Sequence, residues 1–594
     1  MPVRRKPHQP QTNGTVSDFV QTANGLLAER LARASLIGAV MILPFERALA
    51  AAGGFTLTTV EAALMVMLAA AIVACAIRAR TLVWPSPLVV PGLLWVGSIL
   101  LAALVAQVEA GNAFKFSARM VAAGAICLAT LNIVTTPRLA RIVVGCWLAV
   151  ASAVAVIALL ESAQVAWVVE KLTLFRPGFH VAGRQLRATG TLLYPTIASM
   201  YLEVPFALGL WLLMEPGSRW KRAVVFGALA VVGAGITATL TRAGLLGMAA
   251  ALGLTATVRI ARLGWARAGV GVVIALALVL GGIAKLTLSP ELLAARLQSE
   301  GSSRWYGAVY EVPLKLRLDA GTLHRIPLRV SNTGRFTWDS TVDPKYAMSY
   351  HWLRSGSDEV IEFDGIRTPF PQPVLPNESL SFPVTVKAPR QPGSYTLVWD
   401  VVLESRAWLS SEHVPPARTE VEVAGSPAGT INTVMQRLPV SAVRPPRPDL
   451  WRAALQIAGE RRWLGIGPDG FRHVYGPHLG LADWDRRVHA NNMYLEALTG
   501  SGLIGLTTLL WLMTATGLAL VRQCHRVPAG ELMPAIAMLA AWVVVAGHGL
   551  VDSFLTFTPT YASFAIAAGL AFSTAIRHGV GPRLAERNGR AHRV

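Results

Sequence analysis

The sequence predicts a mainly α-helical, polytopic membrane protein of about twelve transmembrane helices with a β-sandwich inserted after the ninth. Of the 594 residues, 53% are hydrophobic and 15% are charged, against about 25% charged in ordinary soluble domains. The apolar residues are gathered into runs of roughly 17–25 residues, long enough to cross a hydrocarbon core of about 30 Å. One long stretch between these runs has the pattern of strands. A disordered chain and a single soluble domain are both excluded.

The first nine apolar runs lie within 33–287 and the last three within 493–576. Residues 1–32 are polar and basic, and we expect a cytoplasmic tail rather than a cleaved signal peptide, because no short apolar core with a small-residue cleavage site is present. In chain order, the predicted spans are 33–51, 55–77, 86–108, 118–135, 142–160, 192–214, 222–240, 243–258, 268–287, 499–520, 533–551 and 558–576.

The charge of the loops predicts the topology. Lys and Arg number 54 against 34 Asp and Glu, a formal net charge of +20. Cytoplasmic loops of membrane proteins are enriched in Lys and Arg, and alternate short loops here carry them. This places both termini, including the tail 577–594, in the cytoplasm, and makes nucleic acid an unnecessary partner. The basic residues of the predicted cytoplasmic loops are Arg78, Arg80, Arg138, Arg141, Arg219, Lys221, Arg222, Arg259, Arg262, Arg267, Arg522 and Arg526.

The large outer insertion begins with a linker, 288–306, followed by a region, 307–424, that reads as strands. Segments such as RIPLRVSN and SYTLVWDVVL alternate apolar and polar residues, and Gly, Pro, Asn and Asp separate them. All four cysteines lie elsewhere, so we expect neither a disulfide nor a thiolate metal site here. With its NTG turn and the tryptophans Trp338, Trp352, Trp399 and Trp408, the region resembles the four-tryptophan immunoglobulin-like domain. We expect a docking or spacing module.

A linker and an active-site segment are predicted for 425–492. After a Pro-rich stretch, the spacing of apolar residues predicts a helix that starts near Asp449 as N-cap. The following GIGPDG (465–470) predicts a tight turn. A Gly-rich turn can also cradle a phosphate, but this one lacks the Lys and Ser or Thr of a nucleotide loop, which favours the plain turn.

Three polar residues are predicted at the outer membrane face: Arg187 before the sixth span, Arg242 between the seventh and eighth, and His489 before the tenth. Each has a structural alternative, because an arginine near a span end often anchors the helix at the interface and a lone histidine often packs. His548 and Asp552 are either a proton relay or a structural hydrogen bond. Glu203, inside the sixth span, needs a partner because a carboxylate in lipid is costly.

Together, the two arginines and the histidine suit transfer from a lipid-linked diphosphate. Guanidinium groups bind phosphate oxygens bidentately and are always charged. An attacking sugar hydroxyl needs a base, and histidine titrates near neutral pH. Arginines can replace the divalent metal of other phosphate enzymes.

The motifs around these residues resemble the O-antigen ligase and polymerase superfamily. The stretch HANNMYLE (489–496), followed by GSGLIGL (500–506), is similar to the family's H-x-H-N-x-[YF]-L signature and Gly-rich helix start. In the family's order come also RATGT at Arg187, TRAG at Arg242, and W-x-x-A-L with G-I-G-P-x-x-F between Trp451 and Phe471. The likeness covers the membrane portion and 449–576. The second histidine of the signature is Asn491 here.

The resemblance implies a GT-C-like glycosyltransferase that uses no metal and no other cofactor. The implied partners are membrane lipids, an undecaprenyl-diphosphate-linked glycan as donor, and a glycan or lipid A-core as acceptor, at the outer face of the cytoplasmic membrane in lipopolysaccharide or polysaccharide biosynthesis. His489 becomes the base, and Arg187 and Arg242 the diphosphate clamp. The supporting residues are Arg184, Asn492, Tyr494, Glu496 and Asp552.

Other functions stay open at this point. A ligase and a polymerase share the same chemistry and differ in the acceptor, and nothing in the sequence separates them. A transporter or flippase is disfavoured, because the two halves show no repeat and the polar residues gather at one face. A membrane-anchored binding protein would not need so many spans or three coordinated motifs.

Overall fold

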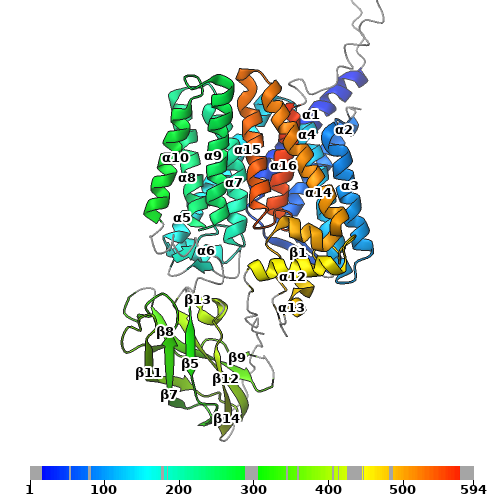
Figure 1. Cartoon of the computed structure of the whole chain (residues 1–594). Helices are drawn as coiled ribbons and strands as arrows, with labels where there is room; N and C mark the ends of the chain where they lie inside the picture. Colours follow the sequence, from blue (N-terminus) through cyan, green and yellow to red (C-terminus); the bar gives the residue numbers. More distant parts are fainter. Residues whose placement is uncertain are drawn as a thin grey trace, which may run out of the picture.

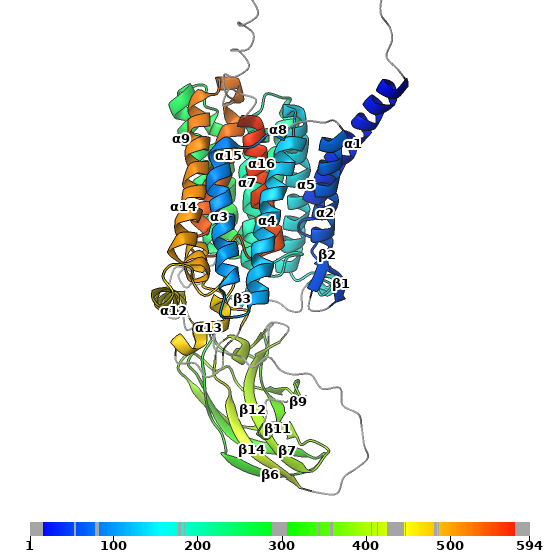
Figure 2. The same cartoon turned by 90° about the vertical axis from the view of Figure 1, so that its right-hand side faces the viewer.

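The computed structural model describes residues 16–52, 55–77, 82–175, 180–182, 185–287, 306–342, 345–356, 360–404, 407–412, 414–424, 445, 447–479, 484 and 486–575. These residues form a bundle of long helices and a separate β region beyond one end of it (Figure 1). Two short helices, α12 (Arg447–Glu460) and α13 (Phe471–His478), lie at that same end of the bundle, as a second view also shows (Figure 2).

Within the described part of the chain, nine helices are long and apolar enough to cross a membrane. A helix overlaps every one of the twelve predicted runs. The nine are α2 (Thr59–Ile77), α3 (Ser86–Leu104), α4 (Ala110–Ile133), α5 (Pro137–Ser162), α7 (Pro195–Met214), α8 (Arg219–Ala238), α9 (Arg242–Leu263), α14 (Met493–Arg526) and α15 (Leu532–His548) with the short turn before it. The remaining three are α1 (Val16–Ile42), α10 (Val270–Thr287) and α16 (Thr558–Ala575).

The first helix differs from the expected span at both ends. Helix α1 covers Val16–Ile42, so it begins inside the predicted tail, and residues predicted to end the span instead form β1 (Ala48–Ala52), paired with β2 (Phe55–Thr58). The polar first half stays helical, with Glu29 and Arg33 in an i,i+4 ion pair at 3.1 Å. The helix ends before Pro44, because proline disfavours a helical conformation in the residue that precedes it.

Helix α7 is the centre of the bundle. Nearly all of its residues are buried, with Tyr201, Phe206 and Trp211 at most 2% exposed. It packs against α5, α8, α9, α15 and α16. The packing around it is close at Gly209, where an added Cβ would come within 3.3 Å of the side chains of Leu229 and Leu148. Glycine fits this position because it has no side chain. The bundle therefore wraps around α7, and α7 begins at the end of the bundle where α12 lies.

The β region consists of two sheets whose strands are antiparallel except for one parallel pair. One sheet has the strand order β10 (Thr368–Pro369), β8 (Tyr346–Arg354), β12 (Gly393–Leu403), β14 (Ala417–Ala424), β6 (Lys315–Asp319), with β9 (Val360–Glu362) on β8 and β13 (Ala407–Trp408) on β12. The other has the order β11 (Ser379–Lys387), β7 (Leu323–Asn332), β5 (Ala308–Glu311). Most buried residues of the two sheets form one cluster, which contains no residue of the helical bundle, and Leu353, Val360 and Val398 form a second, smaller one.

Three of the four tryptophans of this region are buried in its core, Trp408 is half-buried, and the NTG turn is fixed by its asparagine. Trp338, Trp352 and Trp399 are at most 1% exposed and lie in the common core. The side chain of Asn332 accepts a hydrogen bond from the Gly334 N–H at 3.0 Å and donates to Val374 O at 2.9 Å, which fixes the turn. The strands predicted from the alternating pattern are present, and the shorter β5, β9, β10 and β13 were not predicted.

Candidate functional site

A cavity of about 740 Å³ opens at the end of the bundle that faces α12. Four predicted residues from distant segments line it: Arg187, Arg242, His489 and Asp552. The walls come from the first residues of α7 and α9, the last turn of α15, the loop that follows it, the start of α12, and the segment before α14. The sequence motifs therefore converge on one space.

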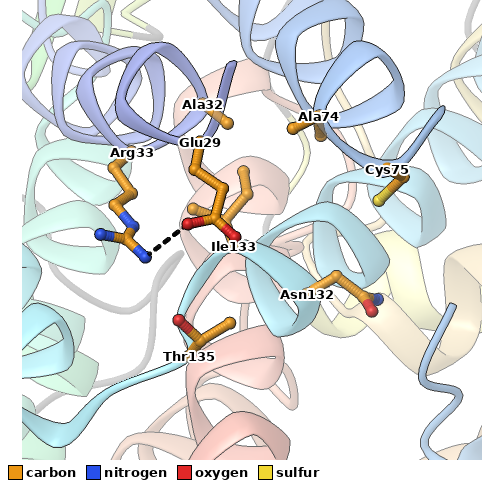
Figure 3. A pocket seen from close by; sticks show the side chains of 9 residues that line it. Glu29, Ala32, Arg33, Ala74, Cys75, Asn132, Ile133 and Thr135 are labelled. Atoms are coloured by element: carbon orange, nitrogen blue, oxygen red, sulfur yellow. Dashed lines mark hydrogen bonds and ion pairs between the residues drawn. The ribbon is translucent and has the colours of Figure 1, made fainter. Parts of the chain in front are cut away.

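A second cavity, between the middle of α1 and the last turns of α2 and α4, is much smaller (Figure 3). Its volume is about 40 Å³, little more than a single water needs. Glu29 and Arg33, its two charged residues, pair with each other. It cannot hold a substrate of any size, so the large cavity is the candidate site.

Arg187 is held by the turn that carries Arg242. It ends β4 (Gln185–Arg187), which pairs with β3 (His180–Ala182). Its Nε donates to Thr239 O at 3.1 Å and its Nη2 to Thr241 Oγ1 at 3.4 Å. The N–H of the next residue donates to Ala238 O at 3.0 Å. The RATG and TLTRAG motifs are thus hydrogen-bonded together, which places the two arginines on the same wall.

A buried carboxylate fixes the turn after Arg187. Glu161, which is fully buried near the end of α5, accepts hydrogen bonds from the N–H groups of Thr189 at 3.0 Å and Gly190 at 2.8 Å. Gly190 has φ +57°, a conformation that favours glycine. Sequence reasoning missed Glu161, because a single acidic residue at a helix end gives no sign of the turn that it stabilises.

Arg242 is the first residue of α9. The preceding Leu240 has φ +53°, and Thr241 is the N-cap, so α8 and α9 are joined by a minimal turn. A helix N-terminus exposes unpaired backbone N–H groups and a partial positive charge. The guanidinium and the helix terminus therefore add positive potential at the same wall of the cavity.

His489 lies between two carboxylates. Its Nδ1 is 3.6 Å from Glu496 Oε1 and 3.8 Å from Asp469 Oδ1, and 18% of the side chain is exposed. Burial lowers the pKa of the imidazole, but the carboxylates of Glu496 and Asp469 outweigh this effect, so the pKa of His489 lies above its ordinary value. A carboxylate at Nδ1 also stabilises the imidazolium that forms when the ring takes a proton.

The Gly-rich turn at 465–470 brings Asp469 to this position. Gly465 has φ +67°, and the N–H groups of Ile466 and Gly467 donate to Thr499 O and Gly500 O at 2.9 and 3.0 Å. These N–H groups are therefore occupied by α14, in agreement with the plain turn. Asp469 forms a bidentate ion pair with Arg472, at 2.8 and 3.0 Å. Its proximity to His489 was not predicted, because it depends on how the turn docks.

The structure describes four of the five predicted supporting residues. Three of them, Asn492, Tyr494 and Glu496, form hydrogen bonds that hold the start of α14 and its neighbours in place. Asn492 caps α14, accepting from the N–H groups of Tyr494 and Leu495 at 2.9 and 3.0 Å, and donates to Leu550 O at 2.8 Å. The Tyr494 hydroxyl donates to Ala546 O at 2.9 Å. Glu496 also accepts from the Ala490 N–H at 2.6 Å. Asp552 lines the cavity, and Arg184 lies outside the described residues.

Two predicted details near the site differ in the structure. Helix α12 begins at Arg447, two residues before the expected Asp449 cap, because Pro448 fits the first turn of a helix. His548 pairs with Glu203 rather than with the Asp552 side chain: its Nδ1 is 3.0 Å from each carboxylate oxygen. Asp552 Oδ1 instead accepts the Ser553 N–H at 2.9 Å. The missing partner of Glu203 is therefore on α15.

Sequence reasoning also missed Arg447 and Arg487, which line the same cavity together with Trp451 of the W-x-x-A-L motif. Trp451 Nε1 donates to Ala490 O at 3.0 Å and so ties α12 to the segment that carries His489. The signal for Arg487 is its position two residues before the histidine. Arg447 follows a Pro-rich stretch, and nothing in its surroundings in the sequence distinguishes it.

The lining divides into a basic and an apolar part. Four arginines contribute to it: Arg187, Arg242, Arg447 and Arg487. Between α9 and α15, the lining is apolar, and Leu246 at its edge is 71% exposed, on the surface that faces lipid if these helices span the membrane. Such a cavity suits an amphiphile with a strongly anionic head. Among the residues that the structure describes, no group of three or more His, Cys, Asp or Glu side chains is arranged to hold a metal ion.

No protein-family model and no curated protein matches this sequence.

Proposed function

We propose that this chain is an O-antigen ligase-like glycosyltransferase that moves a glycan from undecaprenyl diphosphate to a sugar hydroxyl. One observation carries the proposal: Arg187, Arg242 and His489, from three distant segments with the family's motifs, line one cavity of about 740 Å³. The apolar part between α9 and α15 suits the isoprenoid chain, and the arginines suit the diphosphate.

The proposed reaction needs one base and one anion clamp. His489 takes the proton of the acceptor hydroxyl, whose oxygen forms a bond to the anomeric carbon of the glycan. The bond from that carbon to the phosphate oxygen breaks, and undecaprenyl diphosphate leaves with the electron pair. Arg187 and Arg242 stabilise the charge that develops on the diphosphate. Glu496 stabilises the imidazolium during the transfer.

The topology is part of the proposal. Twelve helices cross the cytoplasmic membrane with both termini inside, and the cavity faces outward. The β region is an immunoglobulin-like β-sandwich on the same outer side. In support of this, it lies beyond the end of the bundle where α12 and the cavity lie (Figure 1). The outer face is where a lipid-linked glycan meets an acceptor such as lipid A-core.

The test is glycan transfer by the purified full-length protein in nanodiscs, with undecaprenyl-diphosphate glycan, separate candidate acceptors and a chelator. We expect transfer with the chelator present. His489→Ala should lower the rate about 10²- to 10⁴-fold, and Arg187→Ala or Arg242→Ala about 10²-fold or more. Lipid A-core as the acceptor would indicate a ligase; elongation of a second carrier-linked glycan would indicate a polymerase.

Arg141→Ala is the matched control. Arg141 pairs with Glu215 at 2.9 Å at the opposite end of the bundle, and its side chain is 46% exposed. Exposed ion pairs contribute about 0–1 kcal/mol, so the variant should transfer glycan normally. Wild-type rates in any of the three site variants would remove that residue from the mechanism, and a strict need for a divalent metal would contradict the arginine clamp.

A further inference from the structure

The pair formed by His548 and Glu203 takes no part in the bond-making and bond-breaking steps of the proposed reaction. Both side chains are at most 1% exposed, and His548 Nδ1 is 3.0 Å from each carboxylate oxygen. Ser199 Oγ donates to Glu203 Oε1 at 2.6 Å. A buried carboxylate is costly unless a cation or hydrogen bonds compensate it. An imidazolium compensates its charge and leaves a second N–H free to donate.

His548 is also part of the cavity lining. Because Nδ1 is occupied by Glu203, Nε2 is the ring nitrogen that remains for a ligand. The ring of Phe554 lies against the imidazole edge-on, with the ring centroids 5.8 Å apart, and restricts its orientation. The imidazole is thus held by one carboxylate and one aromatic ring beside the candidate substrate space.

Two glycines of α9 place this pair next to Arg242. A Cβ at Gly247 would come within 3.0 Å of Glu203 Oε2, and one at Gly244 within 2.0 Å of Ser199 Oγ and 3.1 Å of Glu203 Oε1. Only glycine therefore lets Glu203 and Ser199 pack against the first turns of this helix. Arg242, the residue proposed to hold the diphosphate, begins the same helix.

We propose that His548 is a third cationic donor to the diphosphate of the lipid-linked substrate, with Glu203 as the residue that positions it. The ligand chemistry is a diphosphate ester, bound by Nε2–H of His548 together with the guanidinium groups. This inference rests on the proposed function, since it names a further residue of the same site. No bond is made or broken on His548.

The test measures binding of undecaprenyl diphosphate and of undecaprenol to the full-length protein in nanodiscs. A charge-assisted hydrogen bond contributes about 1.5–3 kcal/mol, so His548→Gln should weaken diphosphate binding about tenfold or more. Binding of undecaprenol should stay unchanged. Glu203→Gln should also weaken diphosphate binding, because the imidazole loses its counter-charge. His548→Arg, which keeps a cation opposite Glu203, should bind within about threefold of wild type.

His478→Ala is the matched control, because His478 forms a similar pair, 3.1 Å from Glu460, on α13 and away from the cavity lining. It should bind both lipids as wild type does. The inference is overturned if His548→Gln binds the diphosphate as tightly as wild type. It is also overturned if the Gln and Arg variants lose binding equally along with thermal stability, since the pair would then be structural.

Failure of this inference is separable from failure of the proposed function. Normal diphosphate binding in His548→Gln, with wild-type glycan transfer, would remove His548 and leave the glycosyltransferase intact. Absence of glycan transfer by the wild-type protein would remove the proposed function, while a diphosphate affinity that depends on His548 would still stand.

Discussion

At the scale of single residues, the ionisation of His489 is set by its neighbours. Burial opposes the charged imidazolium, whereas Glu496 and Asp469 favour it, and the net effect is a raised pKa. The two carboxylates are not equivalent. Asp469 is already paired with Arg472, whose guanidinium holds both of its oxygens. Glu496, bound by the Ala490 N–H, is therefore the stronger influence on the imidazole.

We predict that Glu496→Gln moves the acid limb of the activity profile to lower pH. A general base must be neutral, so activity rises with pH through the pKa of His489. Removing the Glu496 charge removes the main effect that raises the pKa of His489. The pKa falls, and the rise of activity with pH therefore occurs at lower pH. The maximal rate should fall as well, because a base of lower pKa takes the proton less readily. Initial rates of glycan transfer between pH 5 and pH 9 measure both effects.

Asp469→Asn serves as the comparison and should move the limb in the same direction by a smaller amount. If Glu496→Gln left the limb in place, or moved it to higher pH, His489 would not be the group whose titration controls transfer.

The sequence predicted the residues of this site that lie inside motifs. Arg187, Arg242, His489 and Glu496 each stand in a short pattern at a helix or strand end. His548 meets its partner, Glu203, across 345 positions of the chain, and Asp469 reaches His489 only because the turn that carries it docks on α14. Such pairs depend on helix packing, which no local pattern encodes.

At the scale of elements, two glycine-rich segments hold the site together. The turn at 465–470 packs against the start of α14, where Gly502 has φ 66° and ψ −165° inside an otherwise helical stretch. Leu503 N donates to Arg462 O at 2.7 Å. A Cβ at Gly502 would come within 2.3 Å of the backbone of Trp463. The kink in α14 therefore lets the turn approach closely enough to carry Asp469 to His489.

We predict that Gly502→Ala destabilises the protein by about 2–3 kcal/mol or more, because the side chain would meet rigid backbone in a conformation that only glycine adopts readily. Glycan transfer should fall with it. Gly253→Ala, in the middle of α9 where an added Cβ would meet no atom within 4 Å, should be neutral or stabilise by up to about 1 kcal/mol. Thermal unfolding in detergent measures the difference, and equal midpoints for the two variants would show that the turn and the kink do not depend on each other.

The hydrophobic pattern predicted the presence of a helix at each apolar run correctly, but it predicted the helix ends less well. Each apolar run is overlapped by a helix, but α14 covers Met493–Arg526 where 499–520 was expected. Its additional first turn exists because Asn492 caps it and Leu550 O accepts from the cap. Helix ends are set by such caps and by tertiary partners, so hydropathy alone locates only the apolar middle.

At the scale of the molecule, the bundle and the β region have separate cores. The buried residues of the bundle cluster around α7, and those of the β region cluster among themselves. The cavity is lined by the bundle, by α12 and by the segments next to them, and by no residue of the two sheets. The candidate site and the β region are thus distinct in structure, although one chain connects them.

We predict that replacing 306–424 with a flexible Gly/Ser linker leaves the chemistry in place and changes the choice of acceptor. His489, the arginines of the cavity and the His548–Glu203 pair all lie outside the deleted segment. Transfer to a small soluble sugar acceptor should therefore stay within about threefold of wild type, since none of the groups that stabilise the transition state is removed. Transfer to a macromolecular acceptor should fall more steeply, because a docking surface contributes binding rather than bond-making. The measurement is the rate with each acceptor, at equal amounts of correctly inserted protein. Complete loss with both acceptors would place the β region inside the catalytic machinery, and equal retention with both would assign it a role other than acceptor recognition.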